Sequence, residues 1–422
     1  MLISFSIQNF KSILDITLST RFDEGKAPNG YKDSEYLIFL EEAKERVSPI
    51  LSIYGANASG KSNIIDSFSI FKNIIFEGVE KTPFIPNKLN NKYKATTFCL
   101  EIVLNSKKYK YTISYDNNTI LFEKLICNDK IIFSCDNKQL KNIIDNNKFY
   151  DNEKLKNIYN IECKDLNQNQ VYSLLMKLST NYANLYSDIT KVYNYLLNQF
   201  EISYDTFRYR KYDALQCLSK EMQSEELALL EITNLIKKFD IDIENISKEV
   251  KNSDISSYNS DLWSNLIDIN TNDKTAKYCK FYTYHKDLYG NIQKFDLKEE
   301  SQGTQLLFSM IAIVLSTLKK GGVLLVDELD NSLHPLLLVQ ITNLFKDKRY
   351  NKLNAQLIFT LHCTDLLEDS FIRKSEVGIV TKNKKNGSTF KKLSTYSNLR
   401  NVMDFRKRYL NGEFSGIPFA YI

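Results

Sequence analysis

Residues 55–62 combine glycine, lysine and serine at the spacing of a loop that binds phosphate. The segment reads Gly-Ala-Asn-Ala-Ser-Gly-Lys-Ser and lies between an apolar run at 50–54 and a helical pattern that begins at Lys61. Glycines let the backbone turn tightly enough to point N–H groups at phosphate oxygens, and the helix start adds its positive end. We expect Lys61 to reach the β- and γ-phosphates of a nucleotide and Ser62 to hold Mg²⁺. The other expected contacts of this phosphate loop are Gly55, Asn57, Ala58, Ser59 and Gly60.

Two adjacent carboxylates, Asp327 and Glu328, follow four consecutive apolar residues at 323–326. Such a run predicts a central strand that is buried on both faces. Buried carboxylates are costly unless a cation lies beside them, so a merely solvated strand end explains the pair less well. We expect Asp327 to join Ser62 around Mg²⁺ and Glu328 to activate the attacking water.

The segment Glu300-Ser301-Gln302-Gly303-Thr304 precedes a strongly apolar helical run at 306–318. A hydroxyl and an unhindered glycine at a helix N-terminus form an anion site, although Ser301 could equally be an ordinary N-cap. The segment lies about 26 residues before Asp327, which favours the anion site. We call residues 300–304 the signature segment and expect Ser301 and Gly303 to contact nucleotide.

Histidine is rare in the chain and occurs at positions 285, 334 and 362. His362 follows a predicted strand at 356–361, so its ring is expected to hydrogen-bond the γ-phosphate. For His285 and His334 a structural role explains the residue at least as well as a catalytic one. Asp330 is expected either to contact a partner subunit or to cap the next helix.

The surrounding pattern predicts an α/β fold in which a mixed sheet is interrupted by a helical insertion. Short strands open the chain, and three alternating runs between residues 98 and 126 predict an antiparallel meander. Helical periodicity dominates from about 136 to 272, after which strands and helices alternate again. We therefore expect an N-terminal half of a nucleotide-binding head at 1–135, a helical insertion at 136–274, and the other half of the head at 275–422.

Composition is that of a soluble globular protein, with 43% hydrophobic and 25% charged residues. A net charge of +5 is too small to argue for nucleic acid by itself. Seven scattered cysteines indicate reduced thiols rather than disulfides or a zinc site. The start of the chain is unlike a signal peptide, and the longest apolar run is shorter than the roughly 20 residues that span a bilayer. We expect a cytoplasmic protein with no membrane partner.

With these parts in this order, the chain resembles the ABC-type ATPases of the SMC/RecF/OLD group. Asn57 and Asn63 fit the group's G-x-N-x-S-G-K-S-N pattern. Asn-Phe-Lys-Ser at 9–12 is similar to its N-terminal strand and loop, which places Lys11 near the nucleotide. Within the group, the chain looks most like the stand-alone ATPases of bacterial abortive-infection and phage-defence operons, the AbiL/RloA type. That likeness is carried by residues 285–286, 300–304, 327–335, 355–362 and 409–418.

The resemblance implies an ABC-ATPase head that uses ATP and Mg²⁺ and forms a homodimer. In such a dimer two heads enclose two ATP molecules, so Ser301 and Gly303 of one copy meet ATP held by the phosphate loop of the other. One departure concerns the switch: the family has Thr-His-Asp, whereas this chain has Leu361-His362-Cys363. The rate of turnover is therefore left open.

The leading functional hypothesis is an ATP-driven switch in an anti-phage system whose effector, a nuclease or a toxin-like protein, is separate. OLD nucleases carry a C-terminal Toprim domain, whereas about 60 residues follow His362 here. The alternative is a DNA-repair or recombination ATPase of RecF type, for which basic clusters at 382–385, 391–392 and 406–408 would bind nucleic acid. A third possibility is a scaffold that binds nucleotide without hydrolysing it.

Overall fold

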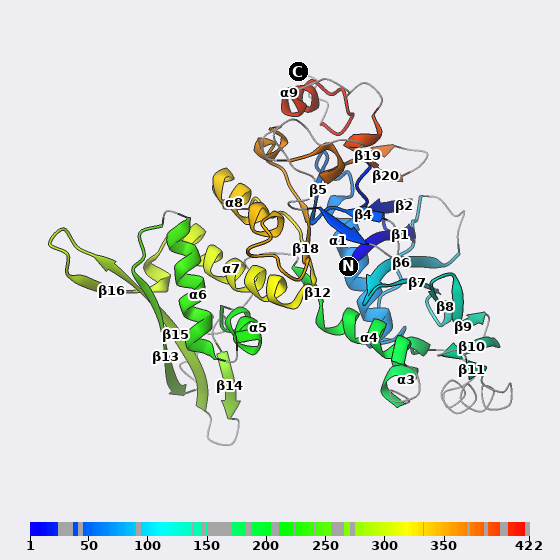
Figure 1. Ribbon diagram of the computed structural model, residues 1–422, viewed down its shortest axis with the longest axis horizontal. Coiled ribbons are helices and arrows are strands. Elements are labelled where there is room, and N and C mark those ends of the chain that lie inside the picture. Colours follow the sequence, from blue (N-terminus) through cyan, green and yellow to red (C-terminus); the bar gives the residue numbers. More distant parts are fainter. Residues whose placement is uncertain are drawn as a thin grey trace.

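The computed structural model shows a mixed α/β molecule built on one large sheet (Figure 1). It describes residues 1–422 except 24–36, 41–44, 90–93, 137–138, 146–147, 150–170, 182–186, 204–210, 223, 240, 255–265, 271–274, 332, 369–371, 384–386, 397–403 and 418–422. The mixed sheet predicted from the sequence is confirmed. Within these described residues, no helix is long and apolar enough to cross a membrane.

Fourteen strands of the described chain form the large sheet, in the order β11-β10-β9-β8-β7-β6-β1-β2-β20-β19-β5-β18-β17-β12. The antiparallel side contains β1 (Leu2–Phe10), β2 (Ile13–Ser19), β6 (Thr96–Leu104), β7 (Lys107–Tyr115), β8 (Ile120–Cys127), β9 (Lys130–Asp136), β10 (Gln139–Asp145) and β11 (Lys148–Phe149). The other side contains β12 (Phe200–Ser203), β17 (Val323–Val326), β18 (Gln356–Thr360), β5 (Ile50–Tyr54), β19 (Val377–Asn383) and β20 (Gly387–Lys392). From β19 to β12 every pairing is parallel, so the strand ends that follow β5, β17 and β18 meet at one edge.

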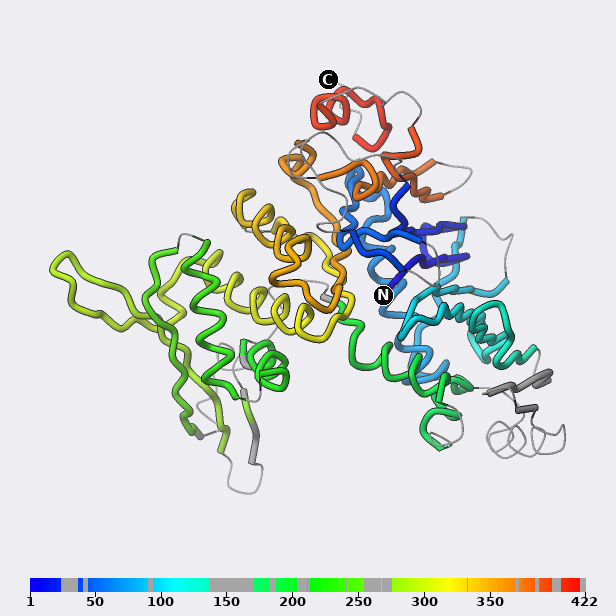
Figure 2. The backbone as a smooth tube through the Cα atoms, viewed as in Figure 1, coloured from blue at the N-terminus to red at the C-terminus, as the bar shows by residue number. Residues whose placement is uncertain are grey.

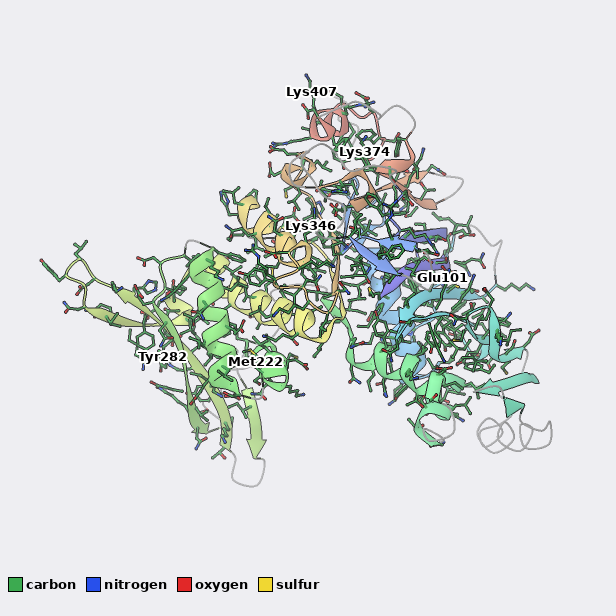
Figure 3. All side chains as sticks on the ribbon, viewed as in Figure 1. Glu101, Met222, Tyr282, Lys346, Lys374 and Lys407 are labelled. Atoms are coloured by element: carbon green, nitrogen blue, oxygen red, sulfur yellow. The ribbon has the colours of Figure 1, made fainter. Side chains whose placement is uncertain are left out.

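Helices cover both faces of the parallel strands, because side chains of successive strand residues point to opposite faces. Leu324 of β17 lies in a core with α7 (Gln302–Lys320) and α8 (Pro335–Lys346). Its neighbour Leu325 lies in a second core with α1 (Lys61–Phe76), α3 (Leu174–Asn181) and α4 (Ser187–Asn198). Lys346 of α8 forms an ion pair of 2.8 Å with the fully buried Glu376, which directly precedes β19 (Figure 3). The ion pair thereby fixes α8 to the start of that strand.

A smaller sheet lies beside α7 and carries the segment before the signature (Figure 1). It is formed by β13 (Asn245–Asp254), β14 (Leu266–Asn270), β15 (Thr275–Lys286) and β16 (Ile292–Asp296). Two helices, α5 (Lys211–Met222) and α6 (Glu225–Lys238), pack with α7 in the same core. A short 3-10 turn, η4 (Leu297–Glu299), connects β16 to the signature segment.

The middle of the chain, expected to be a helical insertion, contains strands as well as helices. Residues 136–274 contain α3 to α6 but also β10 to β14. The strands β13 and β14 were missed because apolar and polar residues alternate only weakly in their sequences. Both strands pair with β15, which lies outside the segment. The three-part division at residues 135 and 274 stays a prediction.

The remaining elements frame the site. A two-stranded ribbon of β3 (Ile38–Leu40) and β4 (Glu45–Val47) lies near the start of the chain. Short 3-10 turns η5 (Asp365–Leu367), η6 (Lys374–Glu376) and η7 (Leu393–Thr395) connect the later strands. The last described helix, α9 (Phe405–Leu410), packs through Tyr409 against Tyr54 at the end of β5.

Candidate nucleotide-binding site

The phosphate loop turns between β5 and α1 with a backbone that requires glycine at two positions. Gly55 has φ +156°, and a Cβ there would lie 2.4 Å from the carbonyl oxygen of Val380. Gly60 has φ +111°, and a Cβ there would lie 2.3 Å from Oγ of Ser388. Gly60 is also the N-cap of α1, so the N-terminus of the helix adjoins the loop, as an anion site requires.

Lys61 lies over this loop and is only 5% exposed. Its Nζ donates to the carbonyl oxygens of Gly55, at 2.7 Å, and Ala56, at 3.3 Å. Burial lowers the pKa of Lys61, while Asp327, Glu328 and Asp330 act in the opposite direction. The ammonium group thus faces the carboxylates from β17, as a γ-phosphate between them would need.

Asp327 follows β17 and is held by Thr360, the last residue of β18. Thr360 Oγ1 donates to Asp327 Oδ1 at 2.5 Å and accepts from the backbone N–H of Glu328 at 2.7 Å. Burial raises the pKa of Asp327, and hydrogen bonds from Thr360 and Ser62 partly offset the effect. The oxygens of Ser62 and Asp327 fit Mg²⁺, which prefers a few hard oxygen ligands beside phosphate and water.

Glu328 and His362 meet at the open side of the site. Nε2 of His362 lies 3.1 Å from Oε1 of Glu328, and both side chains are nearly half exposed. Glu328 has φ +53°, a left-handed backbone that is uncommon outside glycine. Such strain is often found at functional sites, where it aims a side chain.

Asp330 does not cap the next helix, whose N-cap is His334, and its expected contact with a partner subunit stays a prediction. Its Oδ2 accepts from the backbone N–H groups of His362, at 2.7 Å, and Cys363, at 2.6 Å. It therefore caps the turn that carries His362. Burial and the neighbouring Asp330 raise the pKa of Cys363 to about 12, so the thiol stays neutral. The aspartate usual in the family would place a second negative charge beside Asp330.

A hydroxyl and amide network around Ser12 fixes the loop to the N-terminal strands. Asn63 Nδ2 donates to Ser12 Oγ at 2.7 Å, and Ser12 Oγ lies 2.6 Å from Ser388 Oγ. Ser388 in turn donates to the carbonyl oxygen of Ser59 at 2.6 Å. Lys11 forms an ion pair with Asp66 of α1. The sequence predicts Lys11 and Asn63 as nucleotide contacts, and that stays a prediction. Ser388 and Thr360 were missed, because they are recognisable only once the strands are paired.

The signature segment lies elsewhere in the molecule. Ser301 is the N-cap of α7, and its Oγ accepts from the backbone N–H of Thr304 at 3.1 Å. Thr283 and His285 of β15 hold Glu300 at 2.5 and 2.7 Å, respectively. Since β15 and β16 lie far from β5 and α1, the segment is separated from the phosphate loop of its own chain (Figure 1).

The remaining histidines have structural contacts. His285 holds Glu300, as above, and His334 is the N-cap of α8, where its Nδ1 accepts from the backbone N–H of Leu336 at 3.3 Å. For both residues the structural explanation fits the observed geometry.

The basic clusters are largely engaged in contacts within the chain. Lys392 is 5% exposed and lies 2.7 Å from Asp23, and Lys391 lies over the ring of Tyr396. Arg406 contacts Asp365, and Arg408 contacts Glu413. Lys382 and Lys407 are exposed, and Lys407 projects outward from α9 (Figure 3). Residues 384 and 385 lie outside the described part of the chain.

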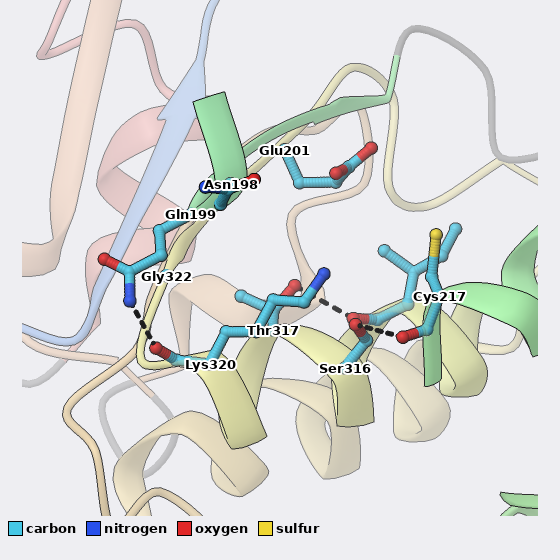
Figure 4. Close-up of a pocket in the computed structure, with 9 residues that line it drawn as sticks. Asn198, Gln199, Glu201, Cys217, Ser316, Thr317, Lys320 and Gly322 are labelled. Atoms are coloured by element: carbon cyan, nitrogen blue, oxygen red, sulfur yellow. Dashed lines mark hydrogen bonds between the residues drawn. The ribbon is translucent and has the colours of Figure 1, made fainter. Parts of the chain in front are cut away.

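A small cavity at the other end of α7 has no features of a ligand site. It measures about 10 Å³, room for about one water molecule. Gln199 and Lys320 close it with a hydrogen bond of 2.8 Å, and Ser316 donates to the carbonyl of Cys217 at 3.2 Å (Figure 4).

The parallel strands, the loop after β5 and the carboxylates after β17 together define a P-loop type of nucleotide-binding domain. The chain belongs to the family described as "AAA domain, putative AbiEii toxin, Type IV TA system", whose model matches residues 50–367. That match covers more than half of the chain, and the family-level resemblance seen in the sequence is thereby confirmed.

Several solved structures are similar over nearly their whole length. The SMC head bound to the C-winged helix domain of ScpA is 13% identical, with a TM-score of 0.41, and the match covers 92% of this chain and 96% of that one. The SMC head domain from Thermotoga maritima is 14% identical, with a TM-score of 0.36, and coverage is 93% and 98%. The Smc head domain with a coiled coil and joint from Pyrococcus yayanosii is 10% identical, with a TM-score of 0.45, and coverage is 98% and 99%. No curated protein sequence matches the chain.

Proposed function

We propose that the chain is an ATPase that works as a dimeric nucleotide switch. One observation carries the proposal: Lys61, the adjacent Asp327 and Glu328, and His362 come from three separate segments and converge at one sheet edge. A cation over a phosphate loop, a buried carboxylate and an exposed carboxylate–imidazole pair are the parts that hydrolysis of a γ-phosphate needs.

Each side chain has a role that follows from its position. The loop N–H groups and Lys61 bind the phosphates, and Ser62 and Asp327 would hold Mg²⁺. When bound, Mg²⁺ neutralises part of the phosphate charge. Glu328 accepts the proton of the attacking water, and His362 donates a hydrogen bond to the γ-phosphate.

The dimer is supported by the separation of the signature segment from the phosphate loop within one chain. Ser301 and Gly303 lie at the start of α7 and are accessible to solvent, whereas the phosphate loop lies at β5. A second copy related by twofold symmetry would bring each signature segment to the other copy's loop. ATP would then favour the closed dimer and hydrolysis the open one.

The biological role that we propose is the ATPase component of an anti-phage system with a separate effector, either a nuclease or a toxin-like protein. The family description, which names a toxin–antitoxin system, supports this role over DNA repair. The internal pairing of Lys392, Arg406 and Arg408 also weakens the case for a DNA-binding surface. Phage challenge of cells that express the chain with and without a candidate effector protein tests the role, and protection that needs both proteins is expected.

Substitution of Glu328 tests the catalytic proposal directly. Glu328→Gln keeps the shape of the side chain but removes the base, so ATP turnover should fall by about 100-fold or more while ATP still binds. Phosphate release and calorimetry with Mg-ATP measure the two quantities. Lys61→Ala is the control that should lose binding as well. A wild-type chain that binds ATP without turnover would instead support a nucleotide-binding scaffold.

A further inference from the structure

The hairpin formed by β15 and β16 projects from the body of the molecule (Figure 2). It carries exposed apolar side chains. In its turn, Leu288 is fully exposed and Tyr289 is 89% exposed. Ile292 and Phe295 of β16 are about half exposed. Single exposed apolar residues are common on proteins, whereas a cluster on one projecting hairpin indicates a surface that binds another molecule.

The turn of the hairpin is ordered by hydrogen bonds to the side chain of Asp287. Oδ1 of Asp287 accepts from the backbone N–H groups of Tyr289, at 2.9 Å, and Asn291, at 2.8 Å. Gly290 supplies the left-handed residue with φ +84°. Leu288 and Tyr289 are therefore presented in a fixed geometry, which reduces the entropy lost when they are buried.

The hairpin is joined firmly to the signature segment. His285 and Thr283 of β15 both hydrogen-bond the Glu300 carboxylate. Asp296, the last residue of β16, forms a capping box with Glu299. Hairpin and signature must therefore move together, so any partner that meets Ser301 is also brought near the hairpin.

A pocket of about 620 Å³ lies on the outer side of the phosphate loop. Its apolar lining includes Ile417 and Leu89, of which Leu89 is 83% exposed, while Val380 borders it with a side chain that is fully buried in the core. The phosphate loop itself forms one side, and Lys382 adds a positive charge at the rim. The walls come from the loop, the end of β19 and the C-terminal segment after α9.

We propose that Leu288 and Tyr289 dock into this pocket on a second copy of the chain when two copies close on ATP. The inference rests on the proposed ATP-bound dimer, in which the signature segment of one copy faces the phosphate loop of the other. Tyr289 follows His285 by four residues, so the Cα atoms of the two residues lie at most about 13 Å apart. His285 in turn holds Glu300 of the signature segment. The pocket shares Ala56 to Ser59 with the loop that the partner's signature segment would meet. Asp287 in the turn and Lys382 at the rim have opposite charges, which favours this pairing.

By twofold symmetry the contact occurs twice in each dimer, and the pocket of each copy is completed only by its partner. The hairpin would thus add a second anchor to the contact made through ATP. It would also make closure specific for copies of this chain, because both hairpin and pocket must match.

A dimerisation assay tests the contact. Full-length Glu328→Gln protein in Mg-ATP is compared with the same protein carrying Leu288→Ser and Tyr289→Ser. The hairpin variant should dimerise about tenfold or more weakly by analytical ultracentrifugation, because its buried apolar area is lost. Its ATP affinity as a monomer should stay within about twofold. Leu227→Ser with Leu230→Ser on α6, which are 49% and 52% exposed, is the matched control and should dimerise normally.

Cysteine cross-linking tests the location. Protein carrying Tyr289→Cys is mixed with protein carrying Ser415→Cys, and an intermolecular disulfide that forms only with Mg-ATP is expected, since such a bond needs Cα atoms within about 7 Å. The wild-type chain controls for its native cysteines.

The outcomes separate the two proposals. If the parent protein stays monomeric in Mg-ATP, the proposed dimeric switch is wrong. If it dimerises but the hairpin variant does so equally well, or the cysteines fail to cross-link, the docking inference alone is overturned. If Ile417→Ser weakens ATP binding by the monomer, the pocket belongs to the nucleoside and docking there is excluded.

Discussion

The side chains around the expected γ-phosphate position differ in how firmly each is held. Asp327 is buried and fixed by Thr360, whereas Glu328 and His362 are open to solvent and contact each other. The difference suits their proposed roles, because a metal ligand needs a fixed position and a proton acceptor needs access to water. Asp330 orients the exposed pair by holding the backbone on either side of the His362–Cys363 peptide.

Removal of the Asp330 carboxylate should therefore impair catalysis more than binding. Asp330→Ala removes the shared acceptor of two backbone N–H groups and frees the turn that carries His362. We expect kcat to fall by about tenfold or more with ATP affinity nearly unchanged. Asp330→Asn, which retains one acceptor oxygen, should recover part of the loss. Equal loss of kcat and binding in both variants would contradict this positioning role.

Among the elements, β5, β18 and β17 position the side chains of the candidate site, because they are parallel neighbours whose carboxyl ends lie together. The loop after β5 is further held from the antiparallel side, where Ser12 of the β1–β2 turn and Ser388 of β20 meet Asn63 and Ser59. Two sheet regions therefore converge on one loop. This explains why the backbone at Gly60 has no room for a side chain.

Substitution at Gly60 tests that element-level constraint. Gly60→Ala adds a Cβ at φ +111° and close to Ser388, so we expect a loss of about 2 kcal/mol of stability together with loss of ATP binding. Urea unfolding and calorimetry measure these effects. Gly290→Ala is a control at a positive φ with open space around it, and it should lose less stability and retain ATP affinity. Normal ATP binding by Gly60→Ala would show that the loop can shift.

At the scale of the whole molecule, the two halves of the nucleotide site lie apart on one chain. The large sheet holds the phosphate loop and carboxylates, while α7 and the smaller sheet hold the signature segment. A single copy therefore leaves one side of the bound nucleotide uncovered. In the proposed dimer, this arrangement would make closure of two copies sensitive to nucleotide, as a switch requires.

Mixing two inactive variants tests the shared site. Gly303→Glu places negative charge where ATP would arrive, yet an acidic residue in the first turn of α7 is favourable for the helix. Lys61→Ala removes the other half of the site. Each variant alone should be inactive, whereas an equal mixture should recover about a quarter of wild-type turnover, because half of the dimers contain one intact site of two. No recovery in a mixture that still forms dimers would contradict the shared site.

Local chemistry in the sequence was sufficient to predict the phosphate loop, the carboxylate pair and His362. Their residue types are those that phosphate and Mg²⁺ would require, and each follows a strongly apolar strand, while binding itself stays a prediction. The antiparallel meander was predicted for the same reason, since alternation within β6 to β8 is a local signal.

The tertiary structure alone decided what depends on pairing between distant segments. Thr360 and Ser388 are ordinary strand residues until β18 and β20 place them beside Asp327 and Ser59. Asp330 became a cap for the turn at His362, and β13 and β14 formed because β15 was available to pair with them. Such contacts reflect long-range geometry, which a pattern of neighbouring residues does not encode.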